Sequence, residues 1–283
     1  MTDDERRHLR TVGIIYRDRV PEAATLAHTL LERVRQTGRT GWTCERSDDD
    51  AIERKLPETD LLCVLGGDGT ILSVARLCAP LRVPILGVNF GRVGFLTELE
   101  PSEVETKLPL YLQGDYWVDE RSMLQAELDV RGNVRRLYAL NDVVMVRGAE
   151  PRVIRIKVWI DGHHYNTTVA DGIIVSTATG STAYNLAAGG PILHPQVRSS
   201  VVTPVAPHLA ADRSLILEPN AVITLELEGE TGAVLAADGQ ITIEIPSESQ
   251  VTVRTNAHVT RFLRRRPPTS FYRILSAKLR DNL

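Results

Sequence analysis

A glycine-rich segment contains the residue with the clearest chemical potential. The sequence LGGDGT at 65–70 follows an apolar strand predicted over 60–65 and precedes a helix predicted over 70–77. Glycines let the backbone approach a ligand closely, and the N–H groups at a helix start attract an anion. A carboxylate in a phosphate cradle repels its ligand, so we expect Asp68 to bind a hydroxyl, accept its proton or hold a metal. The alternative is that Asp68 only caps the helix.

This segment is not one of the common nucleotide-binding loops. It lacks the lysine of a P-loop and the G-x-G-x-x-G dinucleotide fingerprint. It does lie at the carboxyl end of a strand, which is where open α/β sheets bind their ligands. A second glycine cluster, at 89–96, follows the next strand and should stand beside the first. Within it, Phe95 could either stack on a planar ring or belong to the core.

Small polar residues form two further clusters in the second half of the chain. Asn141 and Asp142 precede an apolar strand, where an Asx turn would explain them as well as a ligand would. Asp171 precedes a similar strand, and the segment 177–184 then supplies serine, threonine and glycine at the start of a helix predicted over 182–188. These hydroxyl groups could simply cap that helix or could bind a ligand, and the density of glycine favours close ligand approach.

The elements that must position these loops differ between the two parts of the chain. In the first part, strands are predicted over 12–16, 60–65 and 84–88, and helices over 21–36, 70–77 and 101–112. The helices are recognised by apolar residues that recur at helical spacing. Alternation of strands and helices predicts a parallel sheet with right-handed crossovers. The two glycine loops would then meet at one edge of that sheet.

Near Tyr116 the pattern changes to an alternation of apolar and polar residues with period two. The alternation covers 124–130, 222–227, 241–245 and 251–253, with turn residues between these segments. It predicts antiparallel strands in packed sheets. The basic run 264–266 is interpreted as a solvated hinge, and residues 271–279 have helical character that suggests packing against the first domain.

The length of 283 residues suits one large domain or two ordinary ones, and the change of period favours two. We predict an N-terminal Rossmann-like α/β domain over residues 1–117, completed by the C-terminal segment 264–283. Residues 118–263 are predicted to form a C-terminal antiparallel β-sandwich.

Charge and composition exclude several classes of protein. The 33 basic and 36 acidic residues give a formal charge of −3, so we expect no nucleic-acid partner, since that would need a basic surface. No apolar run is long enough to span a bilayer, and the charged N-terminus lacks the apolar core of a signal peptide. The three cysteines have no Cys-x-x-Cys spacing. We therefore expect a cytoplasmic protein with no membrane partner.

Taken together and in this order, the motifs resemble those of the NAD kinase family. The loop at 66–70 looks like the family's GGDGT loop, and Asn141-Asp142 looks like its Asn-Glu/Asp motif. The segment 171–191 resembles its long central signature, and Asp238-Gly239-Gln240 also fits. The resemblance implies an enzyme that phosphorylates the 2′-hydroxyl on the adenosine ribose of NAD to give NADP. The phosphoryl donor would be ATP or polyphosphate.

The resemblance also implies roles for single residues. Asp68 would be the general base at the 2′-hydroxyl, Gly67, Gly69 and Thr70 would line the phosphates, and Phe95 would border the adenine. The adenosine half and its neighbouring ribose would be held by Asn141, Asp142, Thr182, Ala183 and Tyr184, the nicotinamide end would be contacted by Asp171, and further contacts would come from Arg152, Ala187 and Gln240.

Cofactor and partners follow from the same resemblance. Mg²⁺ or another divalent metal ion would be carried by the phosphoryl donor rather than by protein side chains, and the protein would form a homodimer or homotetramer. Ala178, Ala187 and Val169 depart from residues common in the family, which are Pro, Ser and Arg respectively. The alternatives are a lipid or small-molecule kinase with a GGDGT loop and a non-enzymatic NAD(P)-binding sensor. An intact Asp68 argues against the sensor.

Overall fold

The computed structural model describes residues 9–91, 94–130, 133–149, 152–208 and 213–281, and the chain divides into two compact units. Unit 1 comprises Met1–Glu120 and Thr260–Leu283, and unit 2 comprises Arg121–Val259. Two long strands, β5 (Trp117–Val130) and β16 (Gln250–Arg264), contribute residues to both units. The domain limits predicted from the sequence fall within these two strands.

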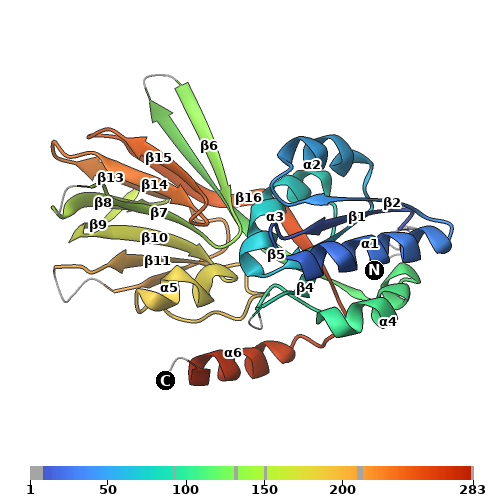
Figure 1. Ribbon diagram of the computed structural model, residues 1–283. Coiled ribbons are helices and arrows are strands. Elements are labelled where there is room, and N and C mark those ends of the chain that lie inside the picture. The colour runs from blue at the N-terminus through green and yellow to red at the C-terminus, as the bar shows by residue number, and fades with distance from the viewer. Residues whose placement is uncertain (1–8, 92–93, 131–132, 150–151, 209–212, 282–283) are drawn as a thin grey trace. The chain divides into compact units, whose positions relative to one another are not determined.

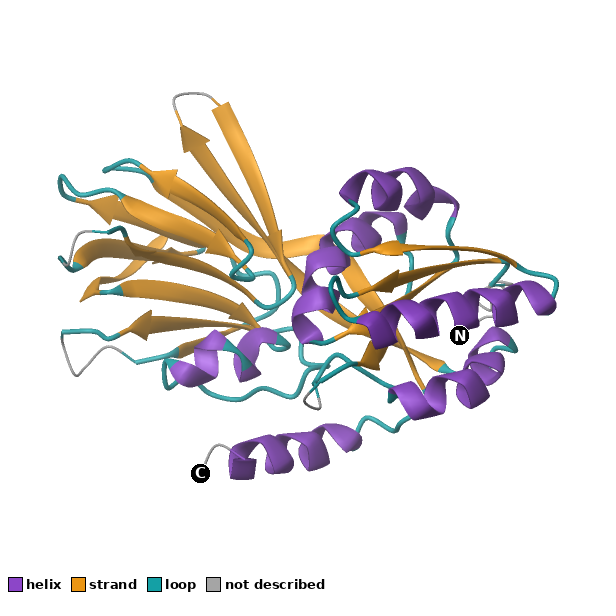
Figure 2. Cartoon of the chain, in the orientation of Figure 1, coloured by secondary structure: helices purple, strands orange, loops and turns teal. Residues whose placement is uncertain are grey.

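Figure 1 traces the elements along the chain, and Figure 2 shows that helices are concentrated in unit 1 whereas unit 2 is built mainly from strands. The helices are α1 (Pro21–Gln36), α2 (Asp49–Lys55), α3 (Asp68–Leu81), α4 (Pro101–Leu112), α5 (Tyr184–Ala187) and α6 (Ser270–Asp281), with 3₁₀ turns at Leu56–Glu58 and Gly180–Thr182. The remaining strands are β1 (Thr11–Tyr16), β2 (Thr40–Glu45), β3 (Leu61–Gly66), β4 (Ile85–Asn89), β6 (Asn133–Ala139), β7 (Asp142–Arg147), β8 (Ile154–Ile160), β9 (His163–Ala170), β10 (Gly172–Thr177), β11 (Ser200–Val205), β12 (Leu215–Leu217), β13 (Ile223–Glu228), β14 (Ala233–Ala237) and β15 (Ile241–Ile245).

Unit 1 is built on a parallel sheet in the order β2-β1-β3-β4. The end of β16 joins this sheet, where Phe262 pairs in parallel with Ile85 of β4. The central strands are buried along their whole length, which explains why β3 is an unbroken apolar run rather than an alternating one. The parallel pairing brings the carboxyl ends of β3 and β4, and so both glycine loops, to the same edge of the sheet.

Helices cover both faces of this sheet. Leu61, Cys63 and Leu65 on one face of β3 belong to a core that includes the apolar stripes of α1 and α4. On the other face, a Cβ placed on Gly87 of β4 would lie 2.6 Å from the Ile71 side chain of α3, so this helix packs close against the sheet. The predicted α/β architecture of the N-terminal part is confirmed.

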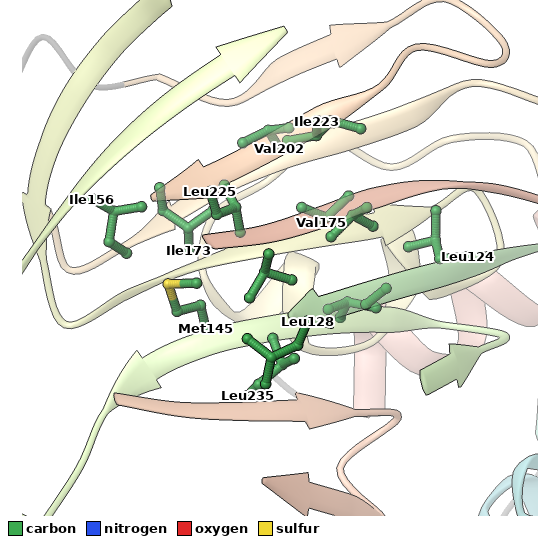
Figure 3. Packing of buried hydrophobic residues seen from close by; sticks show 14 of the residues in the cluster. Leu124, Leu128, Met145, Ile156, Ile173, Val175, Val202, Ile223, Leu225 and Leu235 are labelled. Carbon is green, nitrogen blue, oxygen red and sulfur yellow. The ribbon is translucent and has the colours of Figure 1, made fainter. Parts of the chain in front are cut away.

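Unit 2 contains two antiparallel layers. One is the sheet β12-β11-β10-β7-β14-β15, and the other holds β16, β13, β8 and β9, with β5 and β6 paired beside β16. Figure 3 shows the apolar side chains that fill the space inside unit 2, among them Met145 from the first layer and Leu225 from the second. Along β13, buried and half-buried residues alternate, which is the period-two pattern expected of a strand with one inner face. The predicted C-terminal antiparallel domain is confirmed.

Several elements differ from the prediction. Helix α3 begins at Asp68 and continues to Leu81, beyond both ends of the predicted 70–77. The helix predicted over 182–188 is instead a 3₁₀ turn and one short α-helical turn, interrupted at Ala183, where ψ is −126°. Strand β2 was not predicted, because Trp42 is its one buried residue and a single buried position gives no period. Within the described ranges, no helix is long and apolar enough to cross a membrane.

Candidate functional site

The carboxylate of Asp68 is fixed by the second glycine loop. Its Oδ2 accepts a hydrogen bond from the Phe95 N–H at 2.9 Å, and its Oδ1 accepts one from the Leu96 N–H at 3.0 Å. Asp68 is the first residue of α3, and the residue that precedes the helix is Gly67. The carboxylate therefore connects the two loops instead of capping its own helix, and the capping alternative is wrong. A carboxylate has about four acceptor sites, so both oxygens keep capacity for another donor.

The glycines around Asp68 fall into two groups. A Cβ on Gly94 would lie 2.0 Å from Oδ1 of Asp68, so only glycine lets the carboxylate reach the backbone of the second loop. Around Gly67 and Gly69, in contrast, an added Cβ would meet no described atom within 4 Å. Packing within the protein therefore does not require glycine at positions 67 and 69. The open space beside them is what we expect of a loop that a ligand approaches. Residues 92 and 93 of the second loop lie outside the described residues.

A buried arginine supports the backbone that holds Asp68. One guanidinium nitrogen of Arg264 donates to the carbonyl oxygens of Leu96 and Thr97, at 3.0 and 3.1 Å. The same side chain pairs with Glu98 at 3.5 Å and with Asp119 at 3.4 Å, and all three charged groups are at most 7% exposed. The interpretation of residues 264–266 as a solvated hinge is therefore wrong for Arg264, because it neutralises two buried carboxylates.

Phe95 is half-buried, and part of its surface is covered by helix α6 within unit 1. Its ring centroid is 5.9 Å from that of Phe271, and the Lys278 ammonium lies 4.9 Å from its centroid. Both contacts come from α6, the helix predicted to pack on the first domain. The Phe95 ring is thus packed against α6 on one part of its surface and open on the rest.

In unit 2, the Asn141-Asp142 motif stands at the start of β7 and is held by Asp238. The carboxylate of Asp238 accepts hydrogen bonds from three consecutive backbone N–H groups, those of Leu140 at 2.9 Å, Asn141 at 2.7 Å and Asp142 at 3.1 Å. In return, the Asp238 N–H donates to the Asp142 carbonyl oxygen at 2.9 Å. Asp142 is 5% exposed, and burial, with a smaller contribution from the charge of Asp238, raises its pKa to about 7.

The central signature lies at the same end of this sheet. The Thr177 N–H donates to the Asn141 carbonyl oxygen at 2.8 Å, and a Cβ on Gly180 would lie 2.1 Å from that oxygen. The segment 180–187 therefore rests directly against Asn141. The residues of this segment that are expected to contact the ligand differ in exposure. Thr182 and Ala183 are half-buried, Tyr184 is 42% exposed, and Ala187 is exposed. The structure thus brings this part of the predicted set together with Asn141, and exposed Gln240 lies in the neighbouring hairpin after Asp238.

Asp171 and Arg152 are placed elsewhere in unit 2. Asp171 precedes the opposite end of β10, where its carboxylate pairs with Arg147 at 2.9 Å. From Asp171 to Ser176, the register partner of Asp142, the chain advances about 16 Å at 3.2–3.4 Å per residue. Arg152 is exposed in the segment before β8. Asp171 is therefore not in one cluster with Asn141 and Asp142, although it belongs to the same strand pair.

Two supporting residues were not predicted from the sequence. Asn185 is completely buried, donates to the carbonyl oxygens of Ser181 and Pro191, and accepts from the Thr203 hydroxyl at 2.7 Å. A Cβ on Gly190 would lie 2.1 Å from its Oδ1, so this glycine serves packing rather than a ligand. The signal that the sequence offered for Asn185 was an amide side chain close to Gly189 and Gly190. Arg264, the other supporting residue, gave no signal apart from its basic neighbours.

The donor set for a protein-bound metal is poor. Across the described ranges, no group of three or more His, Cys, Asp or Glu side chains is placed to hold a metal ion. In the glycine loop itself, Asp68 is the one carboxylate, and each of its oxygens already accepts an N–H. The chemistry that this loop can offer on its own is therefore proton acceptance by a fixed carboxylate and anion binding by backbone N–H groups.

Comparison with known proteins identifies both units. The family model described as the ATP-NAD kinase N-terminal domain matches residues 43–116, and the ATP-NAD kinase C-terminal domain matches residues 140–265. An NAD kinase of Dehalococcoides mccartyi is 39% identical over 275 residues, which cover 96% of this chain and 97% of the relative. An NAD kinase of Chloroflexus aurantiacus is 41% identical over 256 residues, which cover 90% of this chain and 91% of the relative.

Solved structures agree on the fold. A yeast NADH kinase complexed with NADH matches with a TM-score of 0.82 and 24% identity, covering 95% of this chain and 87% of its own. An NAD kinase from Archaeoglobus fulgidus in complex with ATP matches with a TM-score of 0.78 and 24% identity, covering 95% of this chain and 98% of its own. Two matching family models and full-length relatives near 40% identity lead to one conclusion: this chain belongs to the NAD kinase family.

Proposed function

We propose that this protein transfers the terminal phosphoryl group of ATP to the 2′-hydroxyl of the adenosine ribose of NAD and so makes NADP. The observation that carries this proposal is the Asp68 carboxylate, fixed by two backbone N–H groups beside a glycine loop that is open to a ligand. The acceptor hydroxyl needs to reach such a carboxylate, and the phosphoryl donor needs to reach the glycine loop beside it. Polyphosphate is the alternative donor, and competition between the two would be read from NADP yields.

Asp68 would act as the general base. A ribose hydroxyl is a poor nucleophile until its proton has an acceptor, and a carboxylate can accept it in the transition state. This help accelerates a reaction roughly 10²- to 10⁴-fold. The two N–H bonds to Phe95 and Leu96 hold the carboxylate in one orientation, so its remaining acceptor sites are aimed before the substrate arrives.

The donor phosphates would lie against the glycine loop. Gly67, Gly69 and Thr70 stand at the start of helix α3, where the positive end of the helix dipole attracts negative charge. A divalent metal ion, when bound to the donor, would neutralise charge on the phosphoryl oxygens. We propose that this ion is carried by the phosphoryl donor rather than by protein side chains.

Unit 2 would hold the dinucleotide. Asn141, Asp142 and the segment 182–184 would bind the adenosine half and its neighbouring ribose, and Asp171 would bind the nicotinamide end. The separation of about 16 Å along β10 supports this division, because a bound dinucleotide is an extended molecule whose two ends need separate contacts. Phe95 of unit 1 would border the adenine ring, and further contacts would come from Arg152, Ala187 and Gln240.

The experiment that tests this function measures NADP formation from NAD, ATP and Mg²⁺ in a coupled assay. We expect Asp68→Asn to lower kcat roughly 10²- to 10⁴-fold while the KM for NAD changes less, because the variant keeps the size of the carboxylate and one of its two backbone hydrogen bonds but cannot accept the proton. Asp50→Asn, which changes an exposed carboxylate on α2 of the same unit, is the matched control and should have wild-type kinetics.

Two outcomes would contradict the proposal. No NADP from the wild-type protein would exclude the activity, and diacylglycerol phosphorylation in a parallel assay would favour a lipid kinase. A near-normal kcat for Asp68→Asn would exclude the base role alone. We further propose that the enzyme works in the cytoplasm as a homodimer or homotetramer, which light scattering on the purified protein would test.

A further inference from the structure

Asp238 makes an unusual set of contacts for a residue in a hairpin turn. It follows β14, has a left-handed backbone with φ of 52°, and turns its carboxylate onto the three N–H groups of residues 140–142. Three consecutive N–H groups that point at one anion form a concave nest, and a carboxylate is its natural occupant. The bond from the Asp238 N–H to the Asp142 carbonyl closes the contact in the other direction.

We propose that Asp238 is a positioning residue for NAD binding: its carboxylate fixes the backbone that presents Asn141 and Asp142. This inference rests on the proposed function for its ligand, NAD. The claim that Asp238 fixes the backbone of residues 140–142 rests on the hydrogen bonds of Asp238 alone. Without the carboxylate, the three N–H groups at the start of β7 would lose their shared acceptor, and the Asn141-Asp142 turn would lose its fixed geometry.

The effect of Asp238 on the ionisation of Asp142 follows from what surrounds Asp142. It opens β7, which lies between β10 and β14. From β10, its register partner is the uncharged Ser176, and after β14 the Asp238 carboxylate accepts the backbone N–H of Asp142 at 3.1 Å. Burial is the larger cause of the raised pKa of Asp142, and the charge of Asp238 is the second. Removing that charge should therefore let Asp142 ionise at a lower pH.

Asp238→Asn is the most informative substitution. Asparagine tolerates the left-handed backbone that most residues resist, so the hairpin should still form, while one acceptor oxygen and the negative charge are lost. The carboxyl titration of Asp142 would be followed by ¹³C NMR in the ligand-free protein, with Asp142→Asn used to assign its signal. Glu244→Gln, which removes an exposed charge from β15 of the same hairpin, is the control.

Two results are expected from Asp238→Asn. The titration midpoint of Asp142 should fall by about one pH unit, and the KM for NAD should rise about tenfold while kcat at saturating NAD falls less. In the wild-type protein, NAD affinity should increase as pH rises through about 7, when Asp142 becomes an acceptor for sugar hydroxyls, and this increase should begin at lower pH in Asp238→Asn. Glu244→Gln should leave both quantities unchanged.

The outcomes separate this inference from the function it builds on. An unchanged midpoint, or an unchanged KM for NAD together with a shifted midpoint, would overturn the positioning role. A general loss of folding would lower the thermal midpoint and move the Asp142 titration all the way to the unfolded value near pH 4, and that result would also overturn it. If the wild-type protein made no NADP, the proposed function would fail, whereas the NMR titration would still decide whether Asp238 controls Asp142.

Discussion

Replacing Asp142 by asparagine should stabilise the folded protein at alkaline pH while it impairs NAD binding. Asp142 is 5% exposed, and its pKa rises from 3.8 to about 7 on folding. Each unit of pKa is worth about 1.4 kcal/mol, so ionising this buried carboxyl costs about 4 kcal/mol above pH 7. Asparagine has a similar shape and no charge, so the variant avoids this penalty.

The pH dependence follows from the direction of the shift. In the unfolded chain Asp142 releases its proton near pH 4, whereas in the folded protein it keeps the proton until about pH 7. The folded state binds more protons over this interval, so the wild-type free energy of unfolding decreases as pH rises from 4 to 7. The stability advantage of Asp142→Asn should therefore be small near pH 4 and grow by about 3 kcal/mol between pH 5 and pH 8.

Urea unfolding followed by tryptophan fluorescence is a suitable assay. Trp159 belongs to unit 2, whereas Trp42 and Trp117 belong to unit 1, so a background with phenylalanine at the latter two positions would report on unit 2. Glu244→Gln is again the control, and its difference from wild type should not vary with pH. The reasoning would be refuted if the gain from Asp142→Asn were no larger at pH 8 than at pH 5.

Two further predictions concern the surroundings of Asp68. Gly94→Ala should lower kcat for NADP formation at least roughly 100-fold, because a Cβ there would lie 2.0 Å from the Asp68 carboxylate, and a kcat near that of wild type would contradict this. Arg264→Met should lower the free energy of unfolding by about 3–5 kcal/mol, because it leaves two buried carboxylates without their cation; urea midpoints for Arg264→Met within about 0.5 M of wild type would contradict this.

The fold was predictable wherever the burial of one face of an element makes apolar residues recur at regular spacing in the sequence. Helices α1 and α4 match the predicted 21–36 and 101–112 because each has a proline at its first position and a repeated apolar stripe. Strand β15 likewise matches 241–245. Strand β2 and the short turns at 180–187 were missed or misjudged because their conformation depends on tertiary hydrogen bonds, which leave no repeat along the chain.

The candidate site shows a different limit. The sequence placed Asp68 in a loop at the edge of a sheet, and the structure adds that the second loop holds its carboxylate. No pattern in the sequence indicates that Arg264, which lies 168 positions after Leu96, supports the second loop. Contacts between residues so far apart in the sequence are set by the topology of the fold. Asp238 was recognised only as part of a motif, and its three N–H donors could not be foreseen.

The return of the chain to unit 1 has a consequence for biosynthesis. A ribosome finishes Met1–Glu120 long before the strand end that completes their sheet, whereas Arg121–Val259 can close as soon as they emerge. Until Phe262 arrives, Ile85 of β4 lacks its partner in β16, and until Arg264 arrives, Glu98 and Asp119 lack their buried cation. The loop that orients Asp68 is thus completed last, so a nascent chain should acquire catalytic competence only after residue 264 has left the exit tunnel.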